Sequence, residues 1–343
     1  MRRQRRRAAD RAAPLPGRHG VEPAEHVPVM VDAVIEALAP RDGALYVDAT
    51  FGAGGYSRAL LAAANCRVAA IDRDPDAVRR GHDLAAGYDG RLEIFTGNFG
   101  DMERLLAAAG AAIEGVAFDL GVSSLQLDTP ERGFSFRADG PLDMRMSGGG
   151  QSAADLVAAL PEAELARLLR ELGEERHARR IARAIGRARV QHPIQRTLAL
   201  ADVVRAAIPN AEPGLDPATR TFQALRIAVN DELGELDRGL EAAEHLLMPG
   251  GRLVVVAFHS LEDRRVKEFL RPRSTTASRP SRHEPPAPDT AAPSFCLVHR
   301  RPIKPSADEV ARNPRARSAR LRAAVRTAAP PWPRCHRQAS SAT

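Results

Sequence analysis

Two short segments of the chain combine carboxylates with glycines or hydroxyls, and each follows an apolar run. Residues 48–57 read DATFGAGGYS, and Asp72 ends the next apolar run. Glycine lets a ligand approach the backbone closely, and a carboxylate at a strand end can accept hydrogen bonds from ribose hydroxyls. The glycines do not follow the G-x-G-x-x-G spacing of dinucleotide sites, which argues against a NAD-dependent dehydrogenase. We therefore predict an adenosine cofactor that has no pyrophosphate.

The second segment, residues 118–126 (FDLGVSSLQ), brings Asp119 to the end of a predicted strand. Ligands of open α/β sheets bind outside the carboxyl ends of the strands. Asp119 should therefore face the same crevice as Gly54 and Asp72. The alternative is that Asp119 only caps a loop.

Both segments belong to an alternation of apolar runs and helical patterns. The runs are short, continuous and bounded by glycine, as buried parallel strands are. We predict strands over residues 45–48, 67–72, 91–95, 115–119 and 252–258, and helices over 57–64, 75–86 and 101–109. This alternation predicts a doubly wound α/β sheet.

The alternation stops between about residues 130 and 245. Ser152 and Asp155 have the spacing of a helix capping box. Helical patterns follow near residues 174–190, 197–207 and 218–246. We interpret residues 135–215 as an inserted helical domain, and residues 26–134 and 216–327 as the α/β domain that contains it.

The ends of the chain are predicted to be disordered and basic. Residues 1–25 form an arm, 271–294 a flexible linker rich in Pro, Ser and Arg, and 328–343 a tail. Residues 1–20 carry a net charge of +6 and residues 271–343 carry +11, so the total of +7 leaves −10 for residues 21–270. Basic ends suit a polyanionic partner, or they are merely solvated.

Composition disfavours several classes of protein. No apolar run approaches the roughly 20 residues of a membrane span, and no apolar segment follows the charged start as it would in a secretory signal. Cys66, Cys296 and Cys335 share no metal-ligand spacing. We therefore expect free thiols, no metal, no membrane and a reducing cytoplasm.

Four arginines form a second basic feature. Within the predicted helix at 174–190, they recur at spacings of four, three and four: Arg176, Arg180, Arg183 and Arg187. Residues at these spacings share one helix face. Such a stripe suits phosphate contacts, although a solvated helix face has the same pattern.

Eight stretches between residues 26 and 326 carry specific motifs. Among them are DATFGAGGYSRALL (48–61), FDLGVSSLQLDTPERGFSFRADGPLDMRMS (118–147), ATRTFQALRIAVNDEL (218–233) and PGGRLVVVAFHSLEDRRVK (249–267). In these stretches the chain resembles the bacterial 16S ribosomal RNA (cytosine-N4)-methyltransferases, the MraW or RsmH family.

The resemblance implies a class I, Rossmann-like methyltransferase sheet with an inserted helical domain that binds RNA. It implies S-adenosylmethionine as the cofactor, with contacts at Gly54, Gly55, Tyr56, Asp72, Phe99, Asp119 and Gln126. The family more often has histidine in place of Tyr56, so a role for an imidazole there does not transfer. The implied partner is 16S ribosomal RNA in the small ribosomal subunit, and the implied enzyme is cytoplasmic, as a monomer or homodimer.

Methyl transfer to a cytosine N4 amine requires alignment of the amine with the sulfonium methyl group, and acceptors for the amine protons. The candidate catalytic residues are Asp119, Ser123, Ser124 and Asp143. Arg145 is a candidate contact to the base or the RNA. His259 either takes up a proton or orders the turn at 258–263. DNA amino-methyltransferases have Pro-Pro-aromatic where this loop has Gly-Val-Ser-Ser, which argues against DNA modification.

Other functions stay open at this point. The enzyme could methylate another RNA, a small molecule or a protein, or the chain could be a non-catalytic RNA-binding assembly factor on the same fold. The basic ends and the arginine stripe disfavour a small-molecule substrate. The intact glycines and carboxylates of the two segments disfavour a chain that has lost its activity.

Overall fold

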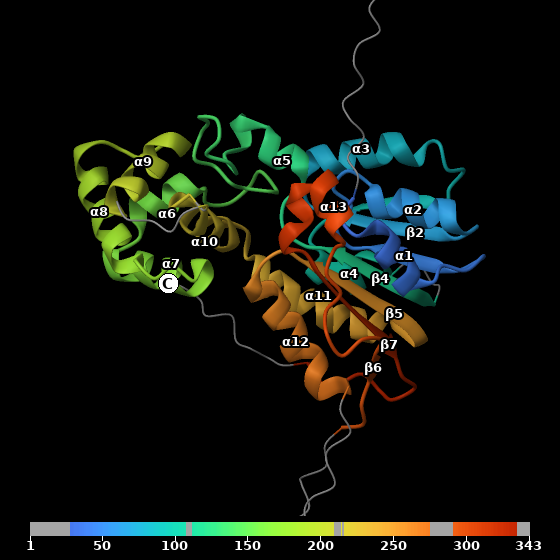
Figure 1. Ribbon diagram of the computed structural model, residues 1–343. Coiled ribbons are helices and arrows are strands. Elements are labelled where there is room, and N and C mark those ends of the chain that lie inside the picture. The colour runs from blue at the N-terminus through green and yellow to red at the C-terminus, as the bar shows by residue number, and fades with distance from the viewer. Residues whose placement is uncertain (1–27, 108–111, 209–213, 215, 275–290, 335–343) are drawn as a thin grey trace, which may run out of the picture.

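The computed structural model describes residues 28–107, 112–208, 214, 216–274 and 291–334 (Figure 1). The predicted arm at 1–25 lies outside the described residues, as do residues 275–290 of the predicted linker.

A seven-stranded sheet forms the centre of the molecule's larger part. The strands are β1 (Leu45–Asp48), β2 (Arg67–Asp72), β3 (Leu92–Thr96), β4 (Ile113–Asp119), β5 (Leu247–Ala257), β6 (Phe295–Leu297) and β7 (Arg320–Arg326). Their order is β3-β2-β1-β4-β5-β7-β6. The first five strands are parallel, whereas β7 is antiparallel to both β5 and β6. This is a Rossmann-like α/β sheet, so the predicted fold class is confirmed.

Helices cover both faces of this sheet. One face carries α1 (Val31–Leu38), α2 (Gly55–Ala63) and α3 (Pro75–Ala85), and the other carries α4 (Met102–Leu105), α11 (Glu232–Leu246) and α12 (Ser260–Ser274). Each face has its own apolar core because side chains of successive strand residues point to opposite sides. Among the described helices, none is long and apolar enough to cross a membrane.

A separate helical unit lies beside the sheet, at the left of Figure 1. It consists of α6 (Ala153–Ala159), α7 (Glu162–Gly173), α8 (Ala178–Gln191), α9 (Thr197–Ala207) and α10 (Ala218–Asn230). These helices enclose a third apolar core, which runs from Phe134 to Leu225. Helix α6 begins at the predicted capping box, where Ser152 Oγ accepts a hydrogen bond from the Asp155 N–H at 3.2 Å.

The single helix predicted over residues 218–246 is wrong. Helix α10 ends at Asn230 and α11 begins at Glu232, because Asp231 between them has a left-handed backbone (φ 47°), which aspartate tolerates better than most residues. Helix α10 packs into the helical unit, whereas α11 packs on the sheet. One chain connection between the two parts of the molecule therefore lies at this residue.

The C-terminal region is folded over more of its length than predicted. Residues 271–274 complete α12, and Ser294 is buried. Trp332 donates from its backbone N–H to Glu244 at 3.0 Å, and from its indole N–H to the carbonyl of Ala292 at 2.9 Å. The prediction of a flexible linker over 271–294 is therefore wrong for residues 271–274 and 292–294, and the prediction of a disordered tail from 328 is wrong for residues 328–334.

Much of the C-terminal positive charge is used inside the fold. Arg320 and Arg322 pair with Asp263 at 3.0 and 2.7 Å. Arg326 is buried, and its guanidinium donates to the carbonyls of Glu244 and Ser294. These arginines stabilise β7 against the sheet, and their charge is not that of a free basic tail.

Replacing Arg273 tests the buried ion pair at the end of α12. The Arg273 guanidinium lies 2.7 Å from the carboxylate of Glu244, whose side chain is 1% exposed. Arg273→Met should lower the free energy of unfolding by about 3–5 kcal/mol, because it leaves a buried charge without its partner. Denaturant unfolding measures the loss. Arg104→Met removes an exposed pair with Asp101 and should cost less than about 1 kcal/mol; equal losses would contradict the argument.

Candidate active site

A cavity opens at the carboxyl ends of the parallel strands. The segments that follow β1 to β5 all contribute to its walls, and Pro28 and Arg315 add residues from near the two ends of the described chain. Asp72 and Asp119 both line it, as their positions at strand ends predict. The cavity therefore collects most of the predicted cofactor residues in one place.

Asp48 holds the glycine-rich loop that follows β1. Its carboxylate is buried and accepts hydrogen bonds from the Ser57 N–H at 3.1 Å, the Ser57 hydroxyl at 2.7 Å and the Thr50 N–H at 3.3 Å. Burial raises the pKa of Asp48 to about 6. These bonds fix both ends of the loop, so its backbone can form a defined wall.

Gly54 and Gly55 allow the loop to pack tightly. Gly54 has φ 77°, and a Cβ atom there would lie 2.8 Å from the Phe51 ring. A Cβ atom at Gly55 would lie 2.6 Å from Pro28. Gly55 lines the cavity, whereas Gly54 is not among the residues of its wall. Gly54 therefore shapes the loop instead of facing a ligand.

Asp72 ties the ends of β1 and β2 together. One carboxylate oxygen accepts from the Gly52 N–H at 2.7 Å, and the other accepts from the Asp74 N–H at 2.9 Å. Burial raises the pKa of Asp72. Each carboxylate oxygen has two lone pairs, so the group can accept further hydrogen bonds from a ligand in the cavity.

Asp119 is the most perturbed carboxylate of the site. Its Oδ1 atom is buried and has no hydrogen-bond partner among the described residues. Burial raises the pKa of Asp119 to about 8, the charge of Asp48 acts in the same direction, and the hydroxyl of Tyr56 acts against them. A buried acceptor without a partner is costly, and such costs concentrate at functional sites.

Tyr56 is a buried wall residue whose hydroxyl donates to the carbonyl of Val29 at 2.7 Å. Burial raises the pKa of Tyr56 well above its ordinary value, so the ring stays neutral. The side chain therefore links the glycine-rich loop to the N-terminal segment. This arrangement gives no support for proton transfer by Tyr56.

Phe99 forms an apolar part of the wall. It begins the short helix η1 (Phe99–Asp101) and meets Phe118 edge-on, with ring centroids 5.4 Å apart. A Cβ atom at Gly239 of α11 would lie 2.6 Å from the Phe99 ring. Because Gly239 has no side chain, it leaves the space that the Phe99 ring occupies.

Ser123, Ser124 and Gln126 come from α5 (Ser124–Asp128) and its N-cap, and all three line the cavity. Ser123 Oγ accepts from the Gln126 N–H at 3.2 Å, and Gln126 Oε1 accepts from the Ser123 N–H at 3.0 Å. This capping box occupies Ser123, which weakens its case as a catalytic acceptor. Gln126 also donates to Asp74 at 2.7 Å.

Asp143 and Arg145 pair with each other instead of joining this group. Two guanidinium nitrogens of Arg145 lie 2.7 and 2.9 Å from the Asp143 carboxylate. The hydrogen bond from Arg145 holds the pKa of Asp143 below its usual range. Neither residue belongs to the cavity wall, so the predicted role of Asp143 as an acceptor has no support from its position.

The arginine stripe is only partly helical. Helix α8 begins at Ala178, so Arg176 precedes it, whereas Arg180, Arg183 and Arg187 are exposed on it. Arg183 lies 3.6 Å from Glu162, and that pair is exposed. On the opposite face Ile181 and Ile185 are buried, as predicted.

Sequence reasoning missed an acidic group at the start of α11 and α12. Glu232 and Glu262 line the cavity, and with His259 their ligand atoms all lie within 4.8 Å of one another. Arg226 donates twice to Glu232 at 2.8 Å, and Glu262 accepts from the Phe258 N–H at 2.8 Å. These residues lie in recognised motifs, but nothing in their local spacing indicates that they meet.

His259 orders the turn before α12, one of the two roles considered for it. Its Nδ1 accepts from the Glu262 N–H at 3.4 Å, and its Nε2 lies 3.1 Å from the Glu262 carboxylate. The side chain thus forms a local pair with Glu262.

The sequence matches the profile of the MraW methylase family over residues 23–327. Three similar proteins are each named ribosomal RNA small subunit methyltransferase H. The protein of Rhodospirillum centenum is 62% identical over 93% of this chain and 97% of its own length. That of Paramagnetospirillum magneticum is 60% identical over 91% and 99%, and that of Rhodospirillum rubrum is 58% identical over 90% and 96%.

Replacing Asp119 should change how stability depends on pH. Its pKa is raised to about 8 from 3.8, so the folded state holds a proton that the unfolded state loses between these pH values. The free energy of unfolding must therefore fall as pH rises through this window. Asp119→Asn removes the effect and should raise the thermal midpoint relative to wild type by at least about 2 °C more at pH 9 than at pH 5. Thermal unfolding across this pH range measures it, and a constant difference would contradict the assignment.

Proposed function

The chain belongs to the MraW methylase family, and we propose that it transfers the methyl group of S-adenosylmethionine to the N4 amine of a cytosine in the 16S ribosomal RNA of the small ribosomal subunit. The observation that carries this proposal is the cavity, where a glycine-rich loop, Asp72 and a buried oxygen of Asp119 meet at the carboxyl edge of the parallel strands; that oxygen has no hydrogen-bond partner in the described part of the chain. The names of the related proteins support the RNA substrate, and the sequence motifs support the amine. Such a substrate implies a cytoplasmic location.

The charges around the cavity suit S-adenosylmethionine. Glu232 and Glu235 in its wall are paired with Arg226 and Arg238. Asp72 accepts from backbone donors alone, among the bonds resolved for it. A ligand with a positively charged sulfur and amino group would relieve the cost of these buried carboxylates. Asp72 remains our assignment for the ribose hydroxyls, and Phe99 and Gln126 for the adenosine side of the pocket.

The chemistry needed from the chain is modest. When bound, S-adenosylmethionine supplies a methyl group that is already electrophilic. The protein must hold the cytosine amine in line with it and accept a proton from the amine. We assign the proton acceptor to Asp119, because its Oδ1 is buried and without a partner among the described residues. With a pKa of about 8, Asp119 is mostly protonated at neutral pH in the free site. The positive charge of bound S-adenosylmethionine would lower this pKa, so that the carboxylate could accept the proton.

The remaining catalytic and RNA candidates differ in support. Ser124 lines the cavity and is a second acceptor for the amine, whereas Ser123 caps α5 and Asp143 lies outside the wall. We assign the contact with RNA phosphates to Arg180, Arg183 and Arg187 on α8 of the helical unit. Arginine suits this task because its planar guanidinium binds phosphate with two hydrogen bonds.

Methyl transfer to small ribosomal subunits from cells that lack the gene tests the proposal. Mass spectrometry of the nucleosides should show N4-methylcytidine after incubation with S-adenosylmethionine. Asp119→Asn cannot take up a proton, and its turnover at saturating cofactor and RNA should fall by at least about 100-fold. A different methylated nucleotide would overturn the substrate assignment. Binding of the cofactor without any transfer would favour the non-catalytic assembly factor.

A salt titration tests the role of the stripe. Reversing Arg180 and Arg183 to Glu should weaken binding to small subunits and lower the slope of log affinity against log salt by about 2, because fewer counterions are released. Turnover at saturating RNA should persist. The matched control reverses Arg67 and Arg104, two exposed arginines of the sheet part. If both double variants bind alike, α8 presents only a solvated face.

A further inference from the structure

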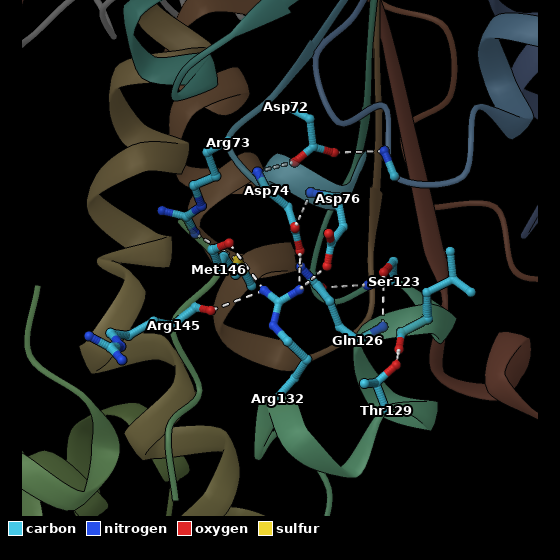
Figure 2. A network of polar contacts seen from close by, with 12 residues as sticks. Asp72, Arg73, Asp74, Asp76, Ser123, Gln126, Thr129, Arg132, Arg145 and Met146 are labelled. Carbon is cyan, nitrogen blue, oxygen red and sulfur yellow. Dashed lines mark hydrogen bonds and ion pairs between the residues drawn. The ribbon is translucent and has the colours of Figure 1, made fainter. Parts of the chain in front are cut away.

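Arg132 lies where three segments near the cavity meet (Figure 2). It ends the short helix η3 (Pro130–Arg132), and its side chain is 22% exposed. Its guanidinium reaches the segment after β2 on one side and residues 145–146 on the other. Arg132 itself is not part of the cavity wall, so any effect on a ligand must pass through its neighbours.

On the first side, the guanidinium meets a buried carboxylate. Arg132 NH1 lies 2.9 Å from Asp74 Oδ2 and 3.5 Å from Asp76 Oδ2. Asp74 is 3% exposed, and its other oxygen caps α3 by accepting from the Asp76 N–H at 2.9 Å. A buried carboxylate keeps its charge and position only while its partners compensate for the lost water.

Asp74 in turn orients Gln126, which lines the cavity. Gln126 Nε2 donates to Asp74 Oδ2 at 2.7 Å, the same oxygen that pairs with Arg132. The amide oxygen of Gln126 is already used by the Ser123 N–H. Both the amide nitrogen and the amide oxygen of Gln126 are thus held by hydrogen bonds. The position of the Gln126 side chain in the cavity wall therefore depends on where Asp74 Oδ2 lies.

On the second side, the guanidinium holds another part of the same wall. Arg132 NH2 donates to the carbonyls of Arg145 and Met146 at 3.1 and 3.2 Å. Met146 lines the cavity, and its N–H donates to Asn230 at the joint with the helical unit. A lysine could pair with Asp74, but its point-like charge cannot also serve two carbonyls in this fixed geometry.

We propose that Arg132 is a positioning residue for S-adenosylmethionine. Arg132 acts through Asp74, which in turn positions Gln126. The inference rests on the proposed function, since it takes the cavity to be the cofactor site. Arg132 touches neither the cofactor nor the RNA base in this scheme. Arg132 instead fixes the position of Gln126, the residue of the cavity wall that contacts the cofactor in this scheme.

Calorimetry with S-adenosylmethionine and S-adenosylhomocysteine on the full chain tests the proposal. Arg132→Met should weaken binding of both about tenfold, and Arg132→Lys about threefold, because coupled neighbours commonly show effects of this size. The turnover at saturating cofactor should stay within about twofold of wild type, so that KM changes and kcat does not. Thermal unfolding identifies a variant that fails to fold, in which case the charge-preserving Arg132→Lys carries the test.

Arg79→Met is the matched control. Arg79 pairs with Asp76 at 2.8 Å on the surface of α3, and its side chain is 68% exposed. It removes one arginine from the same acidic segment without touching Asp74 or Gln126. Cofactor affinity should stay at the wild-type value, and a loss equal to that of Arg132→Met would overturn a specific role for Arg132.

A double-mutant cycle tests the route. Gln126→Ala should itself weaken cofactor binding, and adding Arg132→Met to it should cost less than about twofold more, because the pathway is already cut. Equal factors in the two backgrounds would overturn the route through Gln126. A wild-type chain that does not bind S-adenosylmethionine would overturn the proposed function, whereas wild-type binding with an unchanged Arg132→Met variant would overturn only the positioning role.

Discussion

Burial of several carboxylates at one edge of the sheet is the constraint on which the site depends. For Asp48 and Asp72, hydrogen bonds from backbone N–H groups and a serine hydroxyl offset the free energy lost when the carboxylates leave water. Among the residues that the structure describes, none compensates Asp119 at Oδ1 in this way, and the charge of Asp48 raises the pKa of Asp119 further. The folded chain without a ligand therefore bears the cost of a buried carboxyl group that is mostly protonated at neutral pH. A cation that binds there stabilises the native state, since it has no comparable site in the unfolded chain.

The two parts of the molecule are joined by directed polar bonds and by a small apolar cluster. Their main apolar cores are separate, but Ile227 of α10 packs with Leu233 of α11 and Leu261 of α12 between them. At the joint, Asn230 donates to the carbonyl of Met144 at 2.7 Å and accepts from the Met146 N–H at 2.9 Å, while Arg73 donates to the Asn230 carbonyl at 2.9 Å. Arg73 and Met146 also line the cavity. The helical unit, which carries the arginines assigned to RNA, is thus anchored by residues that also line the cavity.

The sequence allows prediction where the signal is local. Continuous apolar runs predicted β1 to β4 within two residues, whereas β5 begins five residues earlier than predicted, at Leu247. The capping box at Ser152 was visible from two residues, and the strand ends placed Asp72 and Asp119 at one edge. Strand β7 was missed because Arg320, Arg322 and Arg326 interrupt its apolar pattern, and their partners Asp263 and Glu244 are remote in sequence. The ion pair of Arg132 with Asp74 was hidden for the same reason. In contrast, Asp143 pairs with Arg145, only two residues away in the sequence. This pairing argues against Asp143 as an acceptor of the amine protons.

The position of β7 has a consequence for the synthesis of the protein. Although it is formed by residues 320–326, it lies between β5 and β6, and it pairs with β5 from Arg252 to Ala257. A nascent chain that has left the ribosome only up to residue 300 exposes the unpaired edge of β5, and it lacks the cavity wall at Arg315. Such an edge is a template for pairing with other chains. A premature stop codon upstream of β7 therefore does not shorten a dispensable end; it leaves β5 as an unpaired edge strand and β6 without its partner.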